Sequence, residues 1–123
     1  MAKVGGWSID VRTGRLSFSS QTFRLHGLAP GQEPGLQEAV DFYLPEARED
    51  ISRLVQHAIR TGEGWECELP IRNVQGEVVW LRSQGLAEIE QGRVVRVFGA
   101  VQDVTEQRAM RQRQQCENAL LQE

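Results

Sequence analysis

The stretch from Phe98 to Gln115, FGAVQDVTEQRAMRQRQQ, decides the fold because it joins an apolar strand to a polar helix. Residues 98–101 are rich in residues that favour strands. From Glu106 onward the residues are Gln, Arg, Glu, Ala and Met, which favour helices. Asp103, three residues before Glu106, fits the pattern of a capping box. The sequence therefore predicts a helix that begins here and has little apolar surface for folding back onto the domain.

The composition indicates one soluble globular domain. The chain has 123 residues, of which 40% are hydrophobic and 25% are charged. A net charge of −3 argues against nucleic-acid binding through a basic face. The sequence contains neither an apolar run long enough to span a membrane nor the apolar stretch of a signal peptide. We therefore expect a cytoplasmic domain without direct membrane contact, within a protein that could be anchored elsewhere.

Hydrophobic periodicity predicts strands and helices along the rest of the chain. Alternating apolar residues indicate strands at 7–11 and 15–19, and a short helix that carries Phe23 follows and ends at Gly27. The other expected elements are helices at 36–43 and 44–60 and strands at 65–72, 78–89 and 94–101. No strand–helix–strand alternation repeats, which argues against a parallel sheet. We predict an α+β fold: a five-stranded antiparallel sheet with helices on one face and a C-terminal helix.

The face of this sheet that the helices leave uncovered is expected to be apolar. Its predicted residues are Val78, Trp80, Leu86, Val94 and Phe98. An apolar sheet face needs a cover. The terminal helix, a second copy of the chain, or sequence outside this chain would each provide one.

Several short motifs, in this order and spacing, resemble the PAS domain with its PAC motif. They are Gly6-Trp7-Ser8-Ile9-Asp10 with Thr13-Gly14, Phe23 with His26-Gly27-Leu28, Gly76 with Trp80-Leu81-Arg82, and Phe98-Gly99-Ala100-Val101-Gln102-Asp103-Val104-Thr105-Glu106. The resemblance implies a PAS/PAC domain at residues 1–105 and a signalling helix at residues 106–123. It also implies that Asp103 and Thr105 relay a signal from the last strand to this helix.

The family resemblance further implies a place in a larger bacterial signalling protein. A histidine kinase, a diguanylate cyclase or a cyclic-di-GMP phosphodiesterase would follow in the same chain, and the module would form a homodimer. Two functions remain open: a sensor that responds to a signal or small ligand, and a dimerisation module that binds no ligand. Catalysis within these residues is not expected, since the sequence shows no glycine-rich phosphate loop and no nucleophile with a base.

The sequence leaves the cofactor unknown. The haem-binding members of the family use a histidine on the helix that corresponds to residues 44–60, but His57 projects away from the apolar stripe of this helix. Flavin-binding members carry their reactive cysteine in an Asn-Cys-Arg-Phe motif at a helix start, whereas Cys67 lies on a predicted strand. Neither haem nor flavin is therefore expected. Zinc is not expected either, because the histidines and cysteines lack ligand spacing.

A ligand pocket would lie between the long helix and the inner face of the sheet. Its predicted lining is Phe18, Phe42, Val55, Cys67, Leu69, Leu81 and Val97. The alternative is that these side chains simply fill the core.

For the terminal helix, a weak coiled coil and a linker are both open. One coiled-coil register places Ala109, Cys116 and Glu123 at one seam position, with Arg113 and Leu120 at the other.

Overall fold

A computed structural model describes residues 4–121 of the chain, with side chains described as far as Gln115. The elements follow the predicted order along the chain. They are β1 (Val4–Asp10), β2 (Arg15–Phe18), α1 (Ser20–His26), α2 (Leu36–Asp41), α3 (Pro45–Thr61), β3 (Trp65–Arg72), β4 (Val78–Glu90), β5 (Arg93–Asp103) and α4 (Thr105–Leu121). Among the described residues, no helix is long and apolar enough to cross a membrane.

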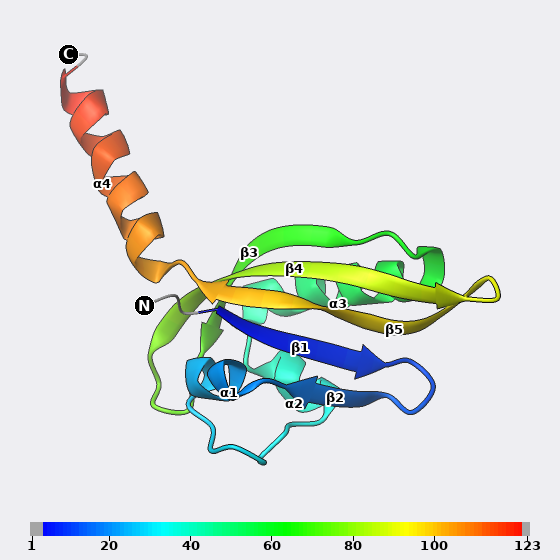
Figure 1. Ribbon diagram of the computed structural model, residues 1–123. Helices are drawn as coiled ribbons and strands as arrows, with labels where there is room; N and C mark the ends of the chain where they lie inside the picture. The colour runs from blue at the N-terminus through cyan, green and yellow to red at the C-terminus, as the bar shows by residue number, and fades with distance from the viewer. Residues whose placement is uncertain (1–3, 122–123) are drawn as a thin grey trace.

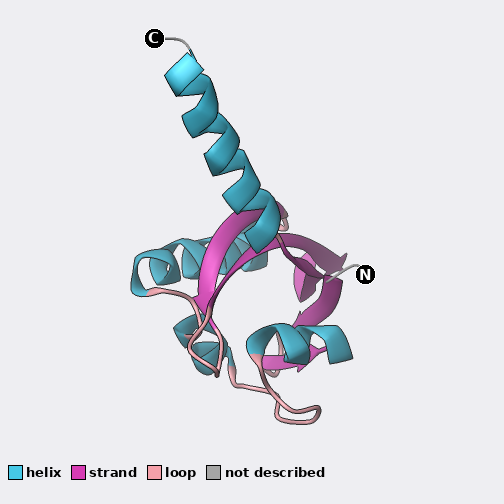
Figure 2. Ribbon diagram, turned by 90° about the vertical axis from the view of Figure 1, so that its left-hand side faces the viewer, coloured by secondary structure: helices cyan, strands magenta, loops and turns pink. Residues whose placement is uncertain are grey.

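The five strands form one antiparallel sheet in the order β2-β1-β5-β4-β3. Figure 1 shows α3 behind this sheet, and Figure 2 shows the strands curving around the domain with helices closing the other side. The predicted α+β fold is thereby confirmed. Pro70 lies on the edge strand β3, where the missing backbone donor of proline costs no sheet hydrogen bond.

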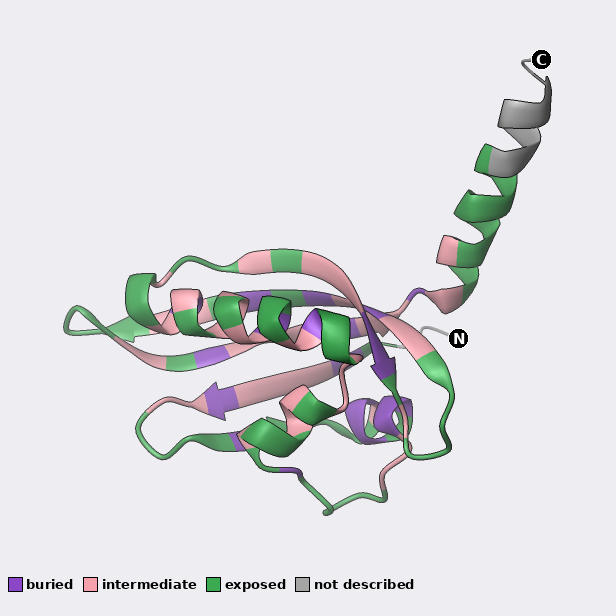
Figure 3. Ribbon diagram, turned by 180° about the vertical axis from the view of Figure 1, so that it is seen from behind, coloured by how far each residue is buried: buried purple, intermediate pink, exposed green. Residues whose placement is uncertain are grey.

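Local sequence explains the ends and the buried face of α3. Pro45 occupies the first turn, where its missing N–H would have had no helical partner. Gly62 ends the helix in the left-handed conformation with φ 80°, which glycine adopts without steric cost. Ile51 and Ala58 are buried, and Figure 3 shows buried and exposed residues alternating along the helix. The helix therefore covers the inner face of the sheet with its apolar stripe.

The predicted outer face contains one error. Glu88 pairs with Arg96, but the next pair is Ile89 with Val94, so β5 holds an extra residue in a bulge. The extra residue turns Val94 toward the helices, where a Cβ placed on Gly62 would lie 3.9 Å from Val94 Cγ2. Val94 therefore belongs to the inner face. The outer face, as the structure has it, comprises Val78, Trp80, Leu86 and Phe98.

The terminal helix α4 projects away from the domain, as Figures 1 and 2 show. From Ala109 to Gln115 its residues are exposed, and Met110 retains 61% of its accessible surface. Because the side chains of Cys116 and Leu120 and the whole of Glu123 lie outside the described part of the chain, the coiled-coil register stays a prediction.

Candidate functional site

One row of residues crosses the inner face of all five strands. Its strand partners, in order, are Phe18, Trp7, Gly99, Gly85 and Trp65. The two tryptophans stack on each other with ring centroids 5.6 Å apart and planes inclined by 24°. A Cβ on Gly85 would lie 2.6 Å from the ring of Trp65, so only glycine leaves room for that indole. Gly85 thus lets the Trp65 ring stack on Trp7 over the centre of the sheet.

A cavity of about 70 Å³ lies between these rings and the helices. Every strand and the helices α1, α2 and α3 contribute to its wall. It is lined by Trp7, Ile9, Leu16, Phe18, Thr22, His26, Leu36, Ala39, Val40, Tyr43, Ile51, Val55, Trp65, Ser83 and Val101. Most of these side chains are apolar, so a molecule held here would be recognised by shape and a few polar groups.

Several polar side chains at the cavity are hydrogen-bonded to the protein. Trp65 Nε1 donates to Ser83 Oγ at 3.3 Å. Thr22 Oγ1 donates to the carbonyl of Gly6 at 2.8 Å. By contrast, Trp7 Nε1 is buried and has no hydrogen-bond partner among the residues that the structure describes. A buried donor without an acceptor costs about 1–3 kcal/mol.

His26 is a buried packing residue at the cavity wall. Its Nδ1 donates to the carbonyl of Thr22 at 2.9 Å, which leaves Nε2 as the unprotonated nitrogen. The ring stacks on Phe18 and meets Phe42 edge to face, with centroids 4.9 and 5.0 Å away. Burial lowers the pKa of His26, and the bond to Thr22 offsets part of this effect.

The structure brings two of the seven predicted pocket residues, Phe18 and Val55, to the cavity wall. The other five, Phe42, Cys67, Leu69, Leu81 and Val97, do not line it. Leu81 and Val97 are fully buried, and Phe42 packs against the core cluster that contains Leu81. The strand residues among them lie on the inner face of the sheet, as predicted, but they fill space there instead of bordering the cavity. Contact of any of the seven with a ligand stays a prediction.

Sequence reasoning missed the residues that define the chemistry of the cavity. Trp7 and Trp65 were assigned to strands, but nothing in their spacing showed that their rings meet. Ser83 did carry a signal, because it is a polar residue at an inward position between Leu81 and Gly85. A polar side chain on the buried face of a strand needs a hydrogen-bond partner, here Trp65.

The base of α4 is held by hydrogen bonds between β4 and the Asp103–Thr105 step. Asp103 Oδ1 accepts from the backbone N–H of Thr105 at 2.9 Å and from its hydroxyl at 2.6 Å. The hydroxyl oxygen of Thr105 in turn accepts from the N–H of Trp80 at 2.9 Å. Val104 N–H donates to the carbonyl of Trp80 at 2.8 Å and is itself buried. The start of the helix is therefore tied to one residue of β4.

Charged side chains add a second connection, which we call the Glu68 cluster: Glu68, Arg82, Arg108 and Arg111. Glu68 Oε2 accepts from Arg82 Nη2 at 2.8 Å, and Glu68 Oε1 accepts from Arg111 Nη2 at 2.9 Å. Arg108 lies 3.6 Å from the same carboxylate and stacks over the Trp80 ring, 3.5 Å from its centroid. The hydrogen bond from Arg82, aided by Arg111, lowers the pKa of Glu68. The first two turns of α4 thus rest on the outer face of the sheet.

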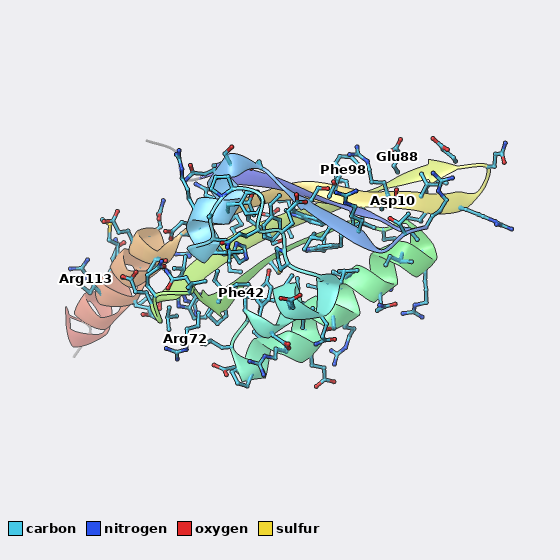
Figure 4. The ribbon with its side chains drawn as sticks, turned by 90° about the horizontal axis from the view of Figure 1, so that it is seen from below. Asp10, Phe42, Arg72, Glu88, Phe98 and Arg113 are labelled. Carbon is cyan, nitrogen blue, oxygen red and sulfur yellow. The ribbon has the colours of Figure 1, made fainter. Side chains whose placement is uncertain are left out.

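The outer face is only partly covered within the chain. Arg108 covers Trp80, and Arg96 lies over the ring of Phe98, 4.3 Å from its centroid. Figure 4 shows Phe98 and Glu88 on the side of the sheet opposite the helices. Leu86 and Val78 remain 58% and 40% exposed.

The two residues considered as cofactor ligands lie away from the cavity. His57 is partly exposed on α3, and its Nε2 lies 3.2 Å from Glu63 Oε2. Cys67 is half-buried on β3, and burial, with the negative charges of Asp50 and Glu68, raises its pKa to about 11. Within the described residues, no three His, Cys, Asp or Glu side chains group as metal ligands.

Comparison with known proteins gives consistent results. A family model described as the PAS fold matches residues 15–101. The blue-light-activated histidine kinase of Brucella anthropi is 31% identical over 108 residues, which is 88% of this chain and 22% of that kinase. This chain therefore spans about a fifth of the length of the curated relatives it matches.

Solved structures resemble the chain in fold. A sensory box histidine kinase/response regulator from Burkholderia thailandensis superposes with a TM-score of 0.79 at 20% identity, covering 98% of this chain and 92% of that one. The N-terminal domain of a diguanylate cyclase with a PAS/PAC sensor, from Marinobacter aquaeolei, superposes with a TM-score of 0.78 at 19% identity, covering 85% of this chain and 98% of that one.

Proposed function

The chain belongs to the PAS family and is a sensory module, and we propose that it couples occupancy of its internal cavity to the position of α4. The observation that carries this proposal is that the same two strands contact both places. On β4, Ser83 lines the cavity three residues after Trp80, which binds Thr105. On β5, Val101 lines the cavity two residues before Asp103. A shift of either strand at the cavity therefore reaches the helix base through a few residues of continuous backbone.

Asp103 and Thr105 are the relay in this proposal. A ligand that displaces the Trp65 ring or Ser83 would move β4 relative to β5. The Trp80 N–H and the Thr105 hydroxyl would then separate or tighten, which changes how firmly α4 is held. The Glu68 cluster responds to the same movement, since Glu68 and Arg82 lie on β3 and β4 while Arg108 and Arg111 lie on α4.

A variant that fills the cavity tests this coupling. Val40 lines the cavity from α2, and Val40→Phe places a ring in the space that a ligand would occupy. We expect the exchange rates of the α4 backbone amides to change by about fivefold or more, the lower range of typical allosteric couplings. Val74→Phe, at a residue that is 59% exposed outside the cavity wall, is the control and should leave them unchanged. Wild-type exchange in Val40→Phe would contradict the proposal.

The proposed parent is a cytoplasmic signalling protein that carries a histidine kinase or a diguanylate cyclase or phosphodiesterase domain in the same chain. Support comes from the named activities of the relatives and from the direction of α4, which projects away from the domain. We propose residues 1–105 as the sensory domain and residues 106–123 as the connecting helix. The proposed partner is a second copy, which would cover Leu86 and Val78 on the outer face and continue along the exposed α4.

The Brucella relatives are named blue-light-activated histidine kinases, but we do not propose blue-light activation for this chain. The cavity of about 70 Å³ is well below the 300–1,000 Å³ that larger ligands occupy. Cys67 lies on a strand outside the cavity wall, and its raised pKa keeps the thiol protonated. The described residues therefore do not fit a flavin. The second candidate function, a ligand-free dimerisation module, is favoured by the exposed outer face and would leave α4 exchange unaffected by Val40→Phe.

A further inference from the structure

One buried indole N–H at the cavity has no acceptor among the residues that the structure describes. Trp7 lines the cavity, and its Nε1–H is buried without an acceptor among residues 4–115. The neighbouring indole differs in this respect, because Trp65 Nε1 donates to Ser83. Buried donors are almost always paired in native proteins, so an unpaired one beside a cavity marks a place where a ligand acceptor would be stabilising.

The cavity wall is poor in charge. Among the residues that the structure describes, no Lys, Arg, Asp or Glu lines it. His26, which does line it, is buried, and burial lowers its pKa and favours the neutral ring, although the bond from Nδ1–H to Thr22 offsets part of this effect. An ionised ligand would lose its hydration here without gaining an opposite charge, which costs several kcal/mol. Carboxylates and ammonium ions are therefore disfavoured.

The size and shape of the cavity narrow the class of ligand further. An engineered apolar cavity of about 150 Å³ accepts benzene, so a cavity of about 70 Å³ accommodates on the order of three to six non-hydrogen atoms. Four aromatic side chains, Trp7, Phe18, Tyr43 and Trp65, form part of its wall. Flat, weakly polar molecules pack well against such rings.

We propose that the cavity binds a small, uncharged, compact molecule with one hydrogen-bond acceptor, such as a carbonyl oxygen, that accepts from Trp7 Nε1. This inference rests on the proposed sensory function and specifies the ligand class for it. Trp7 selects for the acceptor, while the apolar and aromatic wall selects for a neutral body of limited size.

Three small probes of matched size test the proposal: acetone, isobutene and acetate. The first two share their shape but differ in the acceptor oxygen, and the third adds a charge. Binding is followed from the indole N–H signals of the three tryptophans by NMR titration. We expect acetone to shift the Trp7 indole signal saturably. It should bind about three to ten times more tightly than isobutene, the value of one net hydrogen bond. Acetate, the carboxylate, should not bind.

Trp7→Phe keeps an aromatic ring but removes the donor. In this variant the preference for acetone over isobutene should disappear. Trp80→Phe removes an indole N–H on the outer face and is the matched control, which should keep the preference. If Trp7→Phe does not fold, the comparison of the two isosteric probes in the wild-type protein still tests whether the acceptor oxygen contributes to binding. Equal affinity for the isosteres, tighter binding of the carboxylate, or no saturable shift of the Trp7 signal would each overturn the proposal.

The two proposals fail in different ways. If acetone does not bind while Val40→Phe alters α4 exchange, the ligand class is wrong and the sensory coupling stands. If acetone binds through Trp7 and Val40→Phe leaves α4 unchanged, the ligand class stands and the relay is wrong.

Discussion

Thr105→Val removes the hydroxyl that joins α4 to the sheet while keeping the size and branching of the side chain. In the wild-type protein this hydroxyl accepts from Trp80 N–H at 2.9 Å and donates to Asp103 Oδ1 at 2.6 Å. Without it, the N–H of the half-buried Trp80 loses its acceptor, and such a loss costs about 1–3 kcal/mol. The bond to the carboxylate is worth a similar amount, but water can replace part of it. We therefore expect the helix base to be destabilised by about 1–3 kcal/mol.

Hydrogen exchange followed by NMR measures this effect where it occurs. A local loss of about 1–3 kcal/mol raises the exchange rates of the first α4 amides by about 5- to 150-fold, while amides in the centre of β5 change little. Thr13→Val is the matched control. Its hydroxyl also accepts from a backbone N–H, that of Arg15 at 3.2 Å, but in an exposed turn where water replaces it. If Thr105→Val leaves α4 exchange at the wild-type rate, or if Thr13→Val accelerates it equally, the argument for the junction is refuted.

Two further predictions concern the outer face. Because the pKa of Glu68 lies below its ordinary value of 4.5 in the folded protein, its contribution to stability is present above about pH 4.5 and is lost as the pH falls through the lowered pKa. The difference in melting temperature between wild type and Glu68→Gln should therefore shrink in acid, with Glu66→Gln as the charge-matched control; a difference independent of pH would contradict this. Leu86→Glu, at a 58% exposed position, should shift the oligomer toward monomer in light scattering, whereas Gln56→Glu on the exposed side of α3 should not. An unchanged mass for Leu86→Glu would argue against an interface at this face.

Sequence periodicity predicted the faces of the strands well because it follows from backbone geometry alone. On β3, the inward positions of Cys67 and Leu69 and the outward position of Glu68 agree with the alternation in the sequence. The rule failed at Val94, where a bulge adds one residue to β5 and reverses the side on which the residue lies. A bulge depends on how two strands align, and neither strand shows this in its own sequence.

The cavity was harder to predict than the fold because it is defined by unfilled space. Periodicity places Leu81 and Val97 on the inner face, but only packing shows that they fill the core completely. The ring of Trp65 reaches Trp7 across Gly85, where any larger residue would clash with that ring. The row to which these residues belong combines residues from five strands, so it becomes visible only once the register of the sheet is known.

The turn at the Asp103–Thr105 step follows from local sequence, since Asp103 bonds the backbone and hydroxyl of Thr105 two residues later. The role of these two residues as a signal relay stays a prediction. The involvement of Glu68 was not predicted, because it bonds Arg111 across 43 residues of sequence.

A double-mutant experiment on α4 exchange tests the central claim most directly. If the cavity and the helix communicate through the bond between Thr105 and Trp80, the effect of Val40→Phe on α4 amide exchange should fall to less than about twofold once Thr105→Val is present, since coupled sites are not additive. If Val40→Phe changes α4 exchange by the same factor with and without the Thr105 hydroxyl, the signal does not pass through this junction and the account is wrong.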